Sequence, residues 1–132
     1  MHILDTNHYS EINRCTVAGQ HLQARIGNQD VDVFLTIITA EESMRGWLAS
    51  LNSTRGSLVP SYARFHLGMG MLSKWSILDW TDDAETIFLQ LRRMGIRIGT
   101  LDLRIAAIAL VFNATMLSRN LKDLRQVPGL TV

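Results

Sequence analysis

The segment MHILDTN at Met1–Asn7 and the run VFLTII at Val33–Ile38 decide the fold. His2–Leu4 is expected to form a short buried strand, and Val33–Ile38 is an unbroken run of β-branched and apolar residues. Such runs are typical of strands that are buried on both faces of a parallel sheet. Asp5 follows the first strand directly, and the end of an interior strand is a costly place for an unpaired charge. The sequence therefore predicts two interior strands, one of which ends in a carboxylate.

Weaker strands and four helices are predicted along the rest of the chain. The further strands are Ser76–Trp80, Ala114–Leu117 and a terminal Leu130–Val132. The helices, marked by helical spacing of apolar residues or by end signals, are Thr39–Leu51, Ser57–Leu72, Thr81–Met94 and Thr100–Phe112. A capping box of Thr39 and Glu42 is expected to start the first helix, and Gly95 to end the third. Strands that alternate with helices predict right-handed crossovers and an α/β fold, with a parallel sheet covered on both faces.

Length and composition favour one domain spanning residues 1–132, because 47% of the 132 residues are hydrophobic and no length remains for a second core. Thirteen Lys and Arg against twelve Asp and Glu give a formal charge of +1, which neither requires nor excludes a nucleic-acid partner. Cys15 is the only cysteine, which rules out an internal disulfide and predicts a reducing, cytoplasmic location. The longest apolar stretch, Ile105–Phe112, is much shorter than the ~20 residues of a membrane span.

Four acidic residues stand where predicted strands end or helices begin: Asp5, Glu42, Asp102 and Asp123. The last three also fit helix N-termini, where a carboxylate gains from free N–H groups and the helix dipole. Taken singly, each of these three is better explained as a structural cap. Taken together, the four are expected to converge, since an α/β fold gathers its strand ends on one edge of the sheet. The joint placement predicts a site for a divalent cation.

Four short motifs, in order along the chain, carry a resemblance to a known family. They are ILDTN at Ile3–Asn7, T-x-x-E at Thr39–Glu42 with Gly46 four residues on, G-x-x-D-x-x-IAA at Gly99–Ala107, and SRN-x-x-D-L at Ser118–Leu124 followed by VPGL. The ordered set resembles the PIN domain, and within it the VapC-type toxin ribonucleases of bacterial type II toxin-antitoxin systems. The resemblance covers nearly the whole chain. It departs from the family at Leu124, Ser118 and Asn113, where Phe, Thr and Gly are more frequent, and no departure removes a carboxylate.

The resemblance implies a PIN-like three-layer α/β/α sandwich with a central, mainly parallel sheet of about five strands. It implies a Mg²⁺-dependent endoribonuclease, with Mn²⁺ able to substitute, that hydrolyses RNA as the toxin of a toxin-antitoxin pair. A cognate antitoxin and a second copy of the chain, in a homodimer, are the expected partners. Asp5 and Asp102 would be the main direct metal ligands, and Glu42 and Asp123 would bind through water or complete a second metal position. Hard carboxylate oxygens suit both ions.

Residues near the four acids are expected to orient the carboxylates or to bind RNA. Thr6 and Asn120 would orient the carboxylates by hydrogen bonding, although capping of the following helix explains these two residues equally well. His8 is expected to face solvent on a helix that directly follows the first strand. Basic residues flank the acids and would hold RNA phosphates or form a solvated surface. They are Arg92, Arg93, Arg97, Arg119, Lys122 and Arg125.

Two alternative functions remain open. A PIN-fold RNA- or protein-binding module with weak or lost catalysis would keep the same acids. A phosphotransfer domain, such as a receiver or a haloacid dehalogenase-like phosphatase, is disfavoured because DTN lacks a second acid two residues on and Asp5 stands alone early in the chain. The stretch Tyr62–Leu72 would either be buried in the core or leave apolar surface for a partner.

Overall fold

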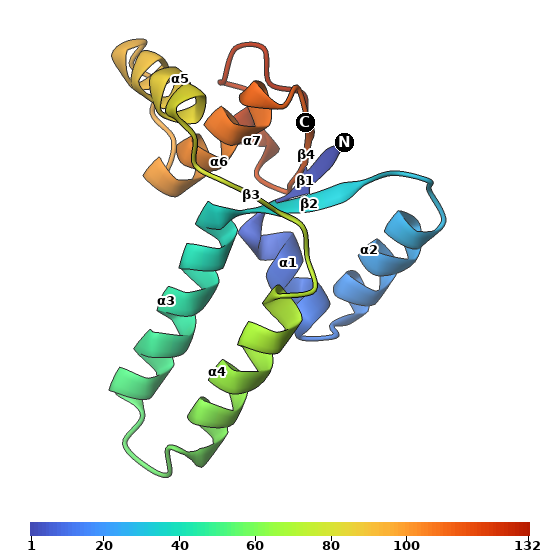
Figure 1. Cartoon of the computed structure of the whole chain (residues 1–132), viewed down its shortest axis with the longest axis vertical. Helices are drawn as coiled ribbons and strands as arrows, with labels where there is room; N and C mark the ends of the chain where they lie inside the picture. Colours follow the sequence, from blue (N-terminus) through green and yellow to red (C-terminus); the bar gives the residue numbers. More distant parts are fainter.

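A four-stranded sheet lies at the centre of the computed structural model, which describes residues 1–132 (Figure 1). The strands are β1 (His2–Leu4), β2 (Val33–Thr36), β3 (Ile77–Leu78) and β4 (Thr115–Leu117). Their order across the sheet is β3-β2-β1-β4, and every neighbouring pair is parallel. The predicted α/β fold class with a parallel sheet is therefore confirmed.

Seven helices cover the two faces of this sheet. They are α1 (Thr6–Asn13), α2 (Val17–Gly27), α3 (Ile37–Ser53), α4 (Val59–Leu72), α5 (Asp82–Arg93), α6 (Thr100–Val111) and α7 (Leu121–Leu124). Figure 1 shows α5, α6 and α7 on one side of the sheet and α1 to α4 on the other, with α3 and α4 projecting away from the sheet as an antiparallel pair. The predicted three-layer arrangement is confirmed. None of these helices has the length and apolar character needed to cross a membrane.

The predicted fifth strand is reduced to one contact. Thr131 forms an isolated parallel bridge with Thr115 at the β4 edge of the sheet, and no ladder extends from it. Pro128 and Gly129 precede this segment, and Gly129 has a positive φ of 77°. A proline and a left-handed glycine interrupt extended backbone, so the segment meets the sheet only at its end. The sheet therefore has four strands and not five.

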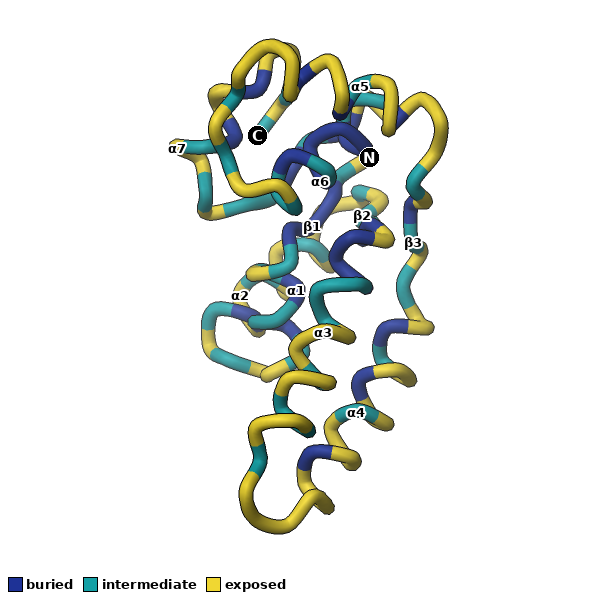
Figure 2. Tube along the Cα trace, turned by 90° about the vertical axis from the view of Figure 1, so that its left-hand side faces the viewer, coloured by how far each residue is buried: buried dark blue, intermediate teal, exposed yellow.

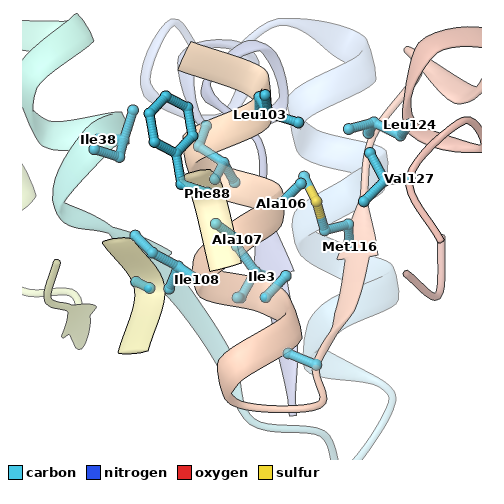
Figure 3. Packing of buried hydrophobic residues seen from close by; sticks show 14 of the residues in the cluster. Ile3, Ile38, Phe88, Leu103, Ala106, Ala107, Ile108, Met116, Leu124 and Val127 are labelled. Carbon is cyan, nitrogen blue, oxygen red and sulfur yellow. The ribbon is translucent and has the colours of Figure 1, made fainter. Parts of the chain in front are cut away.

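The core lies on both faces of β1. Ile3 and Leu4 are both fully buried, and they belong to different hydrophobic clusters because successive side chains of a strand point to opposite faces. The larger cluster packs the sheet against α6, where Ala106 and Ala107 lie beside Met116 and Ile3 (Figure 3). Figure 2 shows the same pattern along the trace, with buried residues concentrated in β1 and α6 and exposed ones at the far end of α3 and α4.

The start of α3 differs from the predicted capping box. The strand β2 ends at Thr36, whose side chain caps the helix by accepting a hydrogen bond from the Thr39 backbone N–H at 3.2 Å. Thr39 itself is fully buried inside the helix, so the predicted cap at this residue was wrong. The apolar run at Ile37 and Ile38 belongs to the helix and not to the strand. Glu42 therefore lies in the second turn of α3, free of any capping role.

The helix α2 lies where no element was predicted, and its close approach to α1 depends on Gly19. A Cβ atom at Gly19 would lie 2.1 Å from the backbone oxygen of Glu11, far inside contact distance. Between the two helices, Cys15 has a positive φ of 51°. The pair is therefore joined by a tight turn and held backbone to backbone. The helix α1, which carries Thr6 and His8, is thereby packed against α2.

Candidate active site

The four predicted acids meet at one edge of the sheet. Asp5 follows β1, Glu42 lies in α3 after β2, Asp102 lies in the first turn of α6, and Asp123 lies in the first turn of α7 after β4. The chain leaves β1 toward β2 on one side and returns to β4 on the other. In open parallel sheets, ligands bind in the crevice at such a reversal, outside the carboxyl ends of the strands. The acids therefore surround the position in this fold that favours a ligand.

Asp5 is the most buried and the most firmly bonded of the four acids. Asp5 is 4% exposed and is the N-cap residue of α1. Its Oδ1 accepts hydrogen bonds from the His8 backbone N–H at 2.7 Å and from the His8 ring Nδ1 at 2.9 Å, and Ser118 Oγ donates to Oδ2 at 2.5 Å. Burial alone would raise the pKa of Asp5, but these hydrogen bonds outweigh burial and lower the pKa below its usual value. Asp5 is therefore held as a carboxylate.

Glu42 is oriented by α1. Thr6 Oγ1 donates a hydrogen bond of 2.6 Å to Glu42 Oε1, so the first residue of α1 fixes the side chain of α3. Burial raises the pKa of Glu42, and the negative charges of Asp102, Glu41 and Asp5 raise it further. The predicted orienting role of Thr6 thus has a direct contact behind it, and Glu42 senses the charge of two other acids of the set.

Asn120 joins the remaining two acids. Its Nδ2 donates to Asp102 Oδ2 and to Asp123 Oδ2, each at 3.1 Å, and the Asn120 side chain makes no capping hydrogen bond to α7. Burial raises the pKa of Asp102, the Asn120 hydrogen bond offsets part of this rise, and the charges of Asp5 and Asp123 raise the pKa again. The capping explanation of Asn120 is therefore wrong for its side chain.

No Lys or Arg side chain forms an ion pair with any of the four acids. Glu42, Asp102 and Asp123 form no ion pair, while the nearby Glu41 pairs with Arg45 at 3.0 Å and with Arg104 at 3.9 Å. The six flanking basic residues named above are all exposed, and none forms an ion pair. The structure contains no group of three His, Cys, Asp or Glu side chains close enough to hold an ion as they stand. The acids share one edge, where Asp5 and Glu42 each bond to separate donors and Asp102 and Asp123 share the amide group of Asn120.

Two contacts of the site were not predicted from the sequence. Ser118, which stands where Thr is frequent in the family, directly follows β4 and donates a hydrogen bond to Asp5 at the end of the neighbouring strand β1. His8 was expected to face solvent, and this was wrong: its side chain is 14% exposed and bonds to Asp5. A polar residue directly after the last strand was the available signal for Ser118. For His8, the only signal was its position three residues after a helix cap.

A groove that includes Glu42 in its lining runs between α1, α3 and α4. It has a volume of about 340 Å³, and Thr6 and Glu42 line its inner end. Along α3 it is floored by Gly46 and Ser50, which follow Glu42 at intervals of four residues and leave room above the helix. Tyr9 also lines the groove, its hydroxyl is buried, and burial raises the pKa of this hydroxyl. The groove therefore extends along the α3–α4 pair from Glu42, the one acid of the four that lines it.

Comparison with known proteins supports the fold. No protein-family model matches the chain, and no curated protein matches its sequence. Among solved structures, the chain is similar to the DNA-bound VapBC of Salmonella typhimurium, with a TM-score of 0.77, 21% identity and coverage of 98% of this chain and 94% of that one. It is also similar to VapBC-1 of nontypeable Haemophilus influenzae, with a TM-score of 0.75, 20% identity and the same two coverages, 98% and 94%.

A third similar structure is FitAcB of Neisseria gonorrhoeae, with a TM-score of 0.72, 23% identity and coverage of 95% of this chain and 91% of that one. At these identities the likeness establishes the fold. The chain has the PIN-like α/β fold found in VapBC toxin-antitoxin complexes, as the resemblance predicted.

Proposed function

We propose that the chain is a metal-dependent endoribonuclease, using Mg²⁺ or Mn²⁺, and the toxin of a toxin-antitoxin pair. The observation that carries the proposal is the convergence of four carboxylates, three of them without an ion pair, at the reversal point of the sheet. Buried charge without a partner is unfavourable, and the raised pKa values of Glu42 and Asp102 reflect this. Oxygen donors that repel one another fit a divalent cation.

The hydrogen bonds of the site indicate which residues would bind the cation and which would orient the ligands. Asp5, held ionised by three donors, and Asp102 would be the direct ligands, with Glu42 and Asp123 completing the site through water or at a second position. Thr6 and Asn120 hold the carboxylates in place. A bound divalent cation would neutralise charge on the scissile phosphate and lower the pKa of a water molecule. Exposed Arg and Lys side chains beside Asp123 would hold neighbouring phosphates.

The test of catalysis is cleavage of single-stranded and structured RNA by the purified chain. We expect cleavage with Mg²⁺ or Mn²⁺ and none in excess chelator. Asp5→Asn and Asp102→Asn should each reduce the rate at least about 100-fold while the fold survives, because the exchange keeps the shape and removes the ligand charge.

The matched control is Asp30→Asn, which makes the same exchange at an exposed carboxylate outside the site. Full activity in chelator would refute the metal mechanism. RNA binding without cleavage under all conditions would instead support the alternative, a PIN-fold binding module without catalysis.

An antitoxin partner is supported by the groove and by the solved relatives. The similar structures are described as VapBC or FitAB complexes, and one as a toxin-antitoxin complex of Klebsiella pneumoniae. In this chain the α3 residues that line the groove include Glu42, Gly46 and Ser50, which are spaced four residues apart. An amphipathic helix lying in it would bring its end to the carboxylates, as in helix-in-groove recognition. An arginine there would form paired hydrogen bonds with the acids.

Growth of a bacterial host without the partner tests the toxin assignment. Expression of the wild-type chain should arrest growth, and Asp5→Asn should remove the effect at a matched protein level. Co-expression of the cognate antitoxin should restore growth. Equal tolerance of the wild-type and Asp5→Asn chains would contradict the toxin assignment and leave the nuclease assignment to the cleavage assay.

A further inference from the structure

His8 makes two contacts to the same oxygen of Asp5. As the third residue of α1, His8 directs its backbone N–H to Asp5 Oδ1 at 2.7 Å, which is the ordinary geometry of a capped helix. Its ring then turns back, and Nδ1 lies 2.9 Å from the same Oδ1. The cap accounts for the first contact alone. The ring adds a second donor, and its side chain is 14% exposed, so little solvent competes for the bond.

These contacts leave Asp5 with one free lone-pair direction. An ionised carboxylate has about four lone-pair sites, two on each oxygen. The two donors of His8 occupy both sites on Oδ1, and Ser118 Oγ occupies one site on Oδ2. The remaining site is on Oδ2. Without the ring of His8, Oδ1 would have a free site as well, and the carboxylate would have fewer bonds to hold its plane.

We propose that His8 is a positioning residue that saturates Oδ1 of Asp5, so that Asp5 presents a divalent cation with Oδ2 alone. This inference rests on the proposed function, in which Asp5 is a metal ligand. A ligand that binds through one oxygen suits Mg²⁺ and Mn²⁺, since Mg²⁺ demands near-ideal octahedral geometry. Ca²⁺ accepts carboxylates through one or both oxygens and tolerates irregular sites. By limiting Asp5 to one available oxygen, His8 therefore favours Mg²⁺ and Mn²⁺ over Ca²⁺ at this one ligand.

The ring contact has a close chemical substitute. In histidine Nδ1 is bonded to Cγ, and in asparagine the amide nitrogen is bonded to Cγ, so His8→Asn retains an N–H donor at the same distance from the backbone. His8→Leu keeps much of the bulk and removes the donor. Both variants keep the backbone N–H and hence the helix cap. The pair isolates the ring hydrogen bond from the packing of the side chain.

The experiment is calorimetric titration of Mn²⁺, and separately of Ca²⁺, into the RNA-free protein. For His8→Leu we expect the dissociation constant for Mn²⁺ to rise about tenfold, the lower end of the usual cost of losing a partner that orients a metal ligand. The dissociation constant for Ca²⁺ should rise by a smaller factor. The ratio of the Ca²⁺ constant to the Mn²⁺ constant should therefore decrease. His8→Asn should restore most of the affinity for Mn²⁺. Far-ultraviolet circular dichroism checks the fold of each variant.

The outcomes separate this inference from the proposed function. Wild-type affinity for Mn²⁺ in His8→Leu, or equal losses in His8→Asn and His8→Leu, would overturn the role of the ring. If Asp5→Asn in the same titration leaves Mn²⁺ binding intact, the metal site itself is wrong. If Asp5→Asn abolishes binding and His8→Leu does not weaken it, only the role of His8 fails. Should His8→Leu not fold, His8→Gln replaces it, because its amide nitrogen lies one bond further from the backbone.

Discussion

Two aspartates of the site have pKa values shifted in opposite directions, and their donors explain the difference. Burial acts on both Asp5 and Asp102 in the direction of a higher pKa. Asp5 has three donors to itself, which reverse the effect, whereas Asp102 shares the single amide group of Asn120 with Asp123. The electrostatic repulsion among the acids is therefore seen mainly in the raised pKa values of Asp102 and Glu42. Like charges gathered in this way destabilise the folded state, and a divalent cation bound as proposed would offset that effect.

We predict that Asp102→Asn stabilises the metal-free protein at neutral pH. The exchange removes a charge repelled by Asp5 and Asp123 and keeps an oxygen that can accept from Asn120. The melting temperature should rise by about 2–4 °C, which corresponds to about 1 kcal/mol for a chain of this size. Asp30→Asn, at an exposed carboxylate, should change it little.

The stabilisation of Asp102→Asn should depend on pH in a defined direction. The pKa of Asp102 is raised in the folded state, so the folded wild type takes up a proton before the unfolded chain does as the pH falls. Repulsion in the wild type then disappears, and the difference between the two proteins should shrink between neutral pH and about pH 4. If the difference in melting temperature between Asp102→Asn and the wild type grows as the pH falls, the raised pKa of Asp102 is contradicted. The scans are run in chelator.

At the level of single residues, the sequence predicted the acids better than their partners. Asp5, Asp102 and Asp123 were predicted to converge because strand ends and helix starts are visible in the pattern of apolar residues, and the structure places these three residues at one edge of the sheet. The bond of Ser118 to Asp5 spans 113 residues, and no local pattern indicates which side chain faces which oxygen. For the same reason the turn of the His8 ring toward the protein was missed.

Among the helices, the α3–α4 pair depends on a glycine that helix propensity alone would disfavour. Gly68 lies in the middle of α4 and is buried. A Cβ atom at this position would lie 2.3 Å from Cζ2 of Trp47, on the facing side of α3. The indole ring in turn packs edge-on against Phe65, with ring centroids 5.7 Å apart. Gly68 therefore makes room for the ring that joins the two helices. At Gly70 a Cβ atom would meet nothing, and no packing explains that glycine.

We predict opposite effects for the same substitution at these two glycines. Gly68→Ala should reduce the free energy of unfolding by about 1–3 kcal/mol, because the added methyl group collides with the Trp47 ring. Gly70→Ala should raise it by about 0.4–1 kcal/mol through lower entropy of the unfolded chain. Urea unfolding of the two variants measures both. Equal effects of the two substitutions would contradict the packing of α3 against α4.

The elements that the sequence predicted well are those with strong local signals. Thr81 caps α5, and Gly95 follows its end with a positive φ of 75°, as expected from their residue types. The start of α3 was misplaced because Ile37 and Ile38 suit a strand as well as a helix, and tertiary packing decides between them. The helix α2 has little periodic pattern, and Gly19 within it argues against a helix until the backbone of α1 is placed beside it.

At the scale of the whole molecule, one apolar stripe of α4 has no partner within the chain. Val59, Tyr62 and Met69 are 75%, 57% and 43% exposed, and their spacing of three and seven residues places them on one side of the helix. Ser61, Arg64 and Gly68, which line the groove beside α3, lie on the opposite side. The stretch Tyr62–Leu72 was expected either in the core or on the surface, and it divides between the two.

We predict that this stripe forms the interface of a homodimer. A stable interface buries about 800 Å² on each partner, and light scattering at tens of micromolar should then report twice the mass of the chain. Tyr62→Arg should return the protein to the mass of a monomer, since it places a charge in the apolar stripe. Met94→Arg, at a residue 62% exposed beyond α5, is the control and should leave the dimer intact. A monomeric wild type would contradict the prediction.

The bond between Ser118 and Asp5 also orders events during synthesis. The central strand β1 is made first, but its neighbour β4 and the donors Ser118 and Asn120 belong to the last part of the chain to be made. Parallel pairing across such a separation is slow, and synthesis proceeds at about 5–20 residues per second. A nascent chain that has reached α6 already carries Asp5, Glu42 and Asp102 but lacks Ser118, the third donor to Asp5, and Asn120, the donor to Asp102. The chain is therefore still attached to the ribosome when its first three acids have been made and the hydrogen bonds from Ser118 and Asn120 cannot yet form.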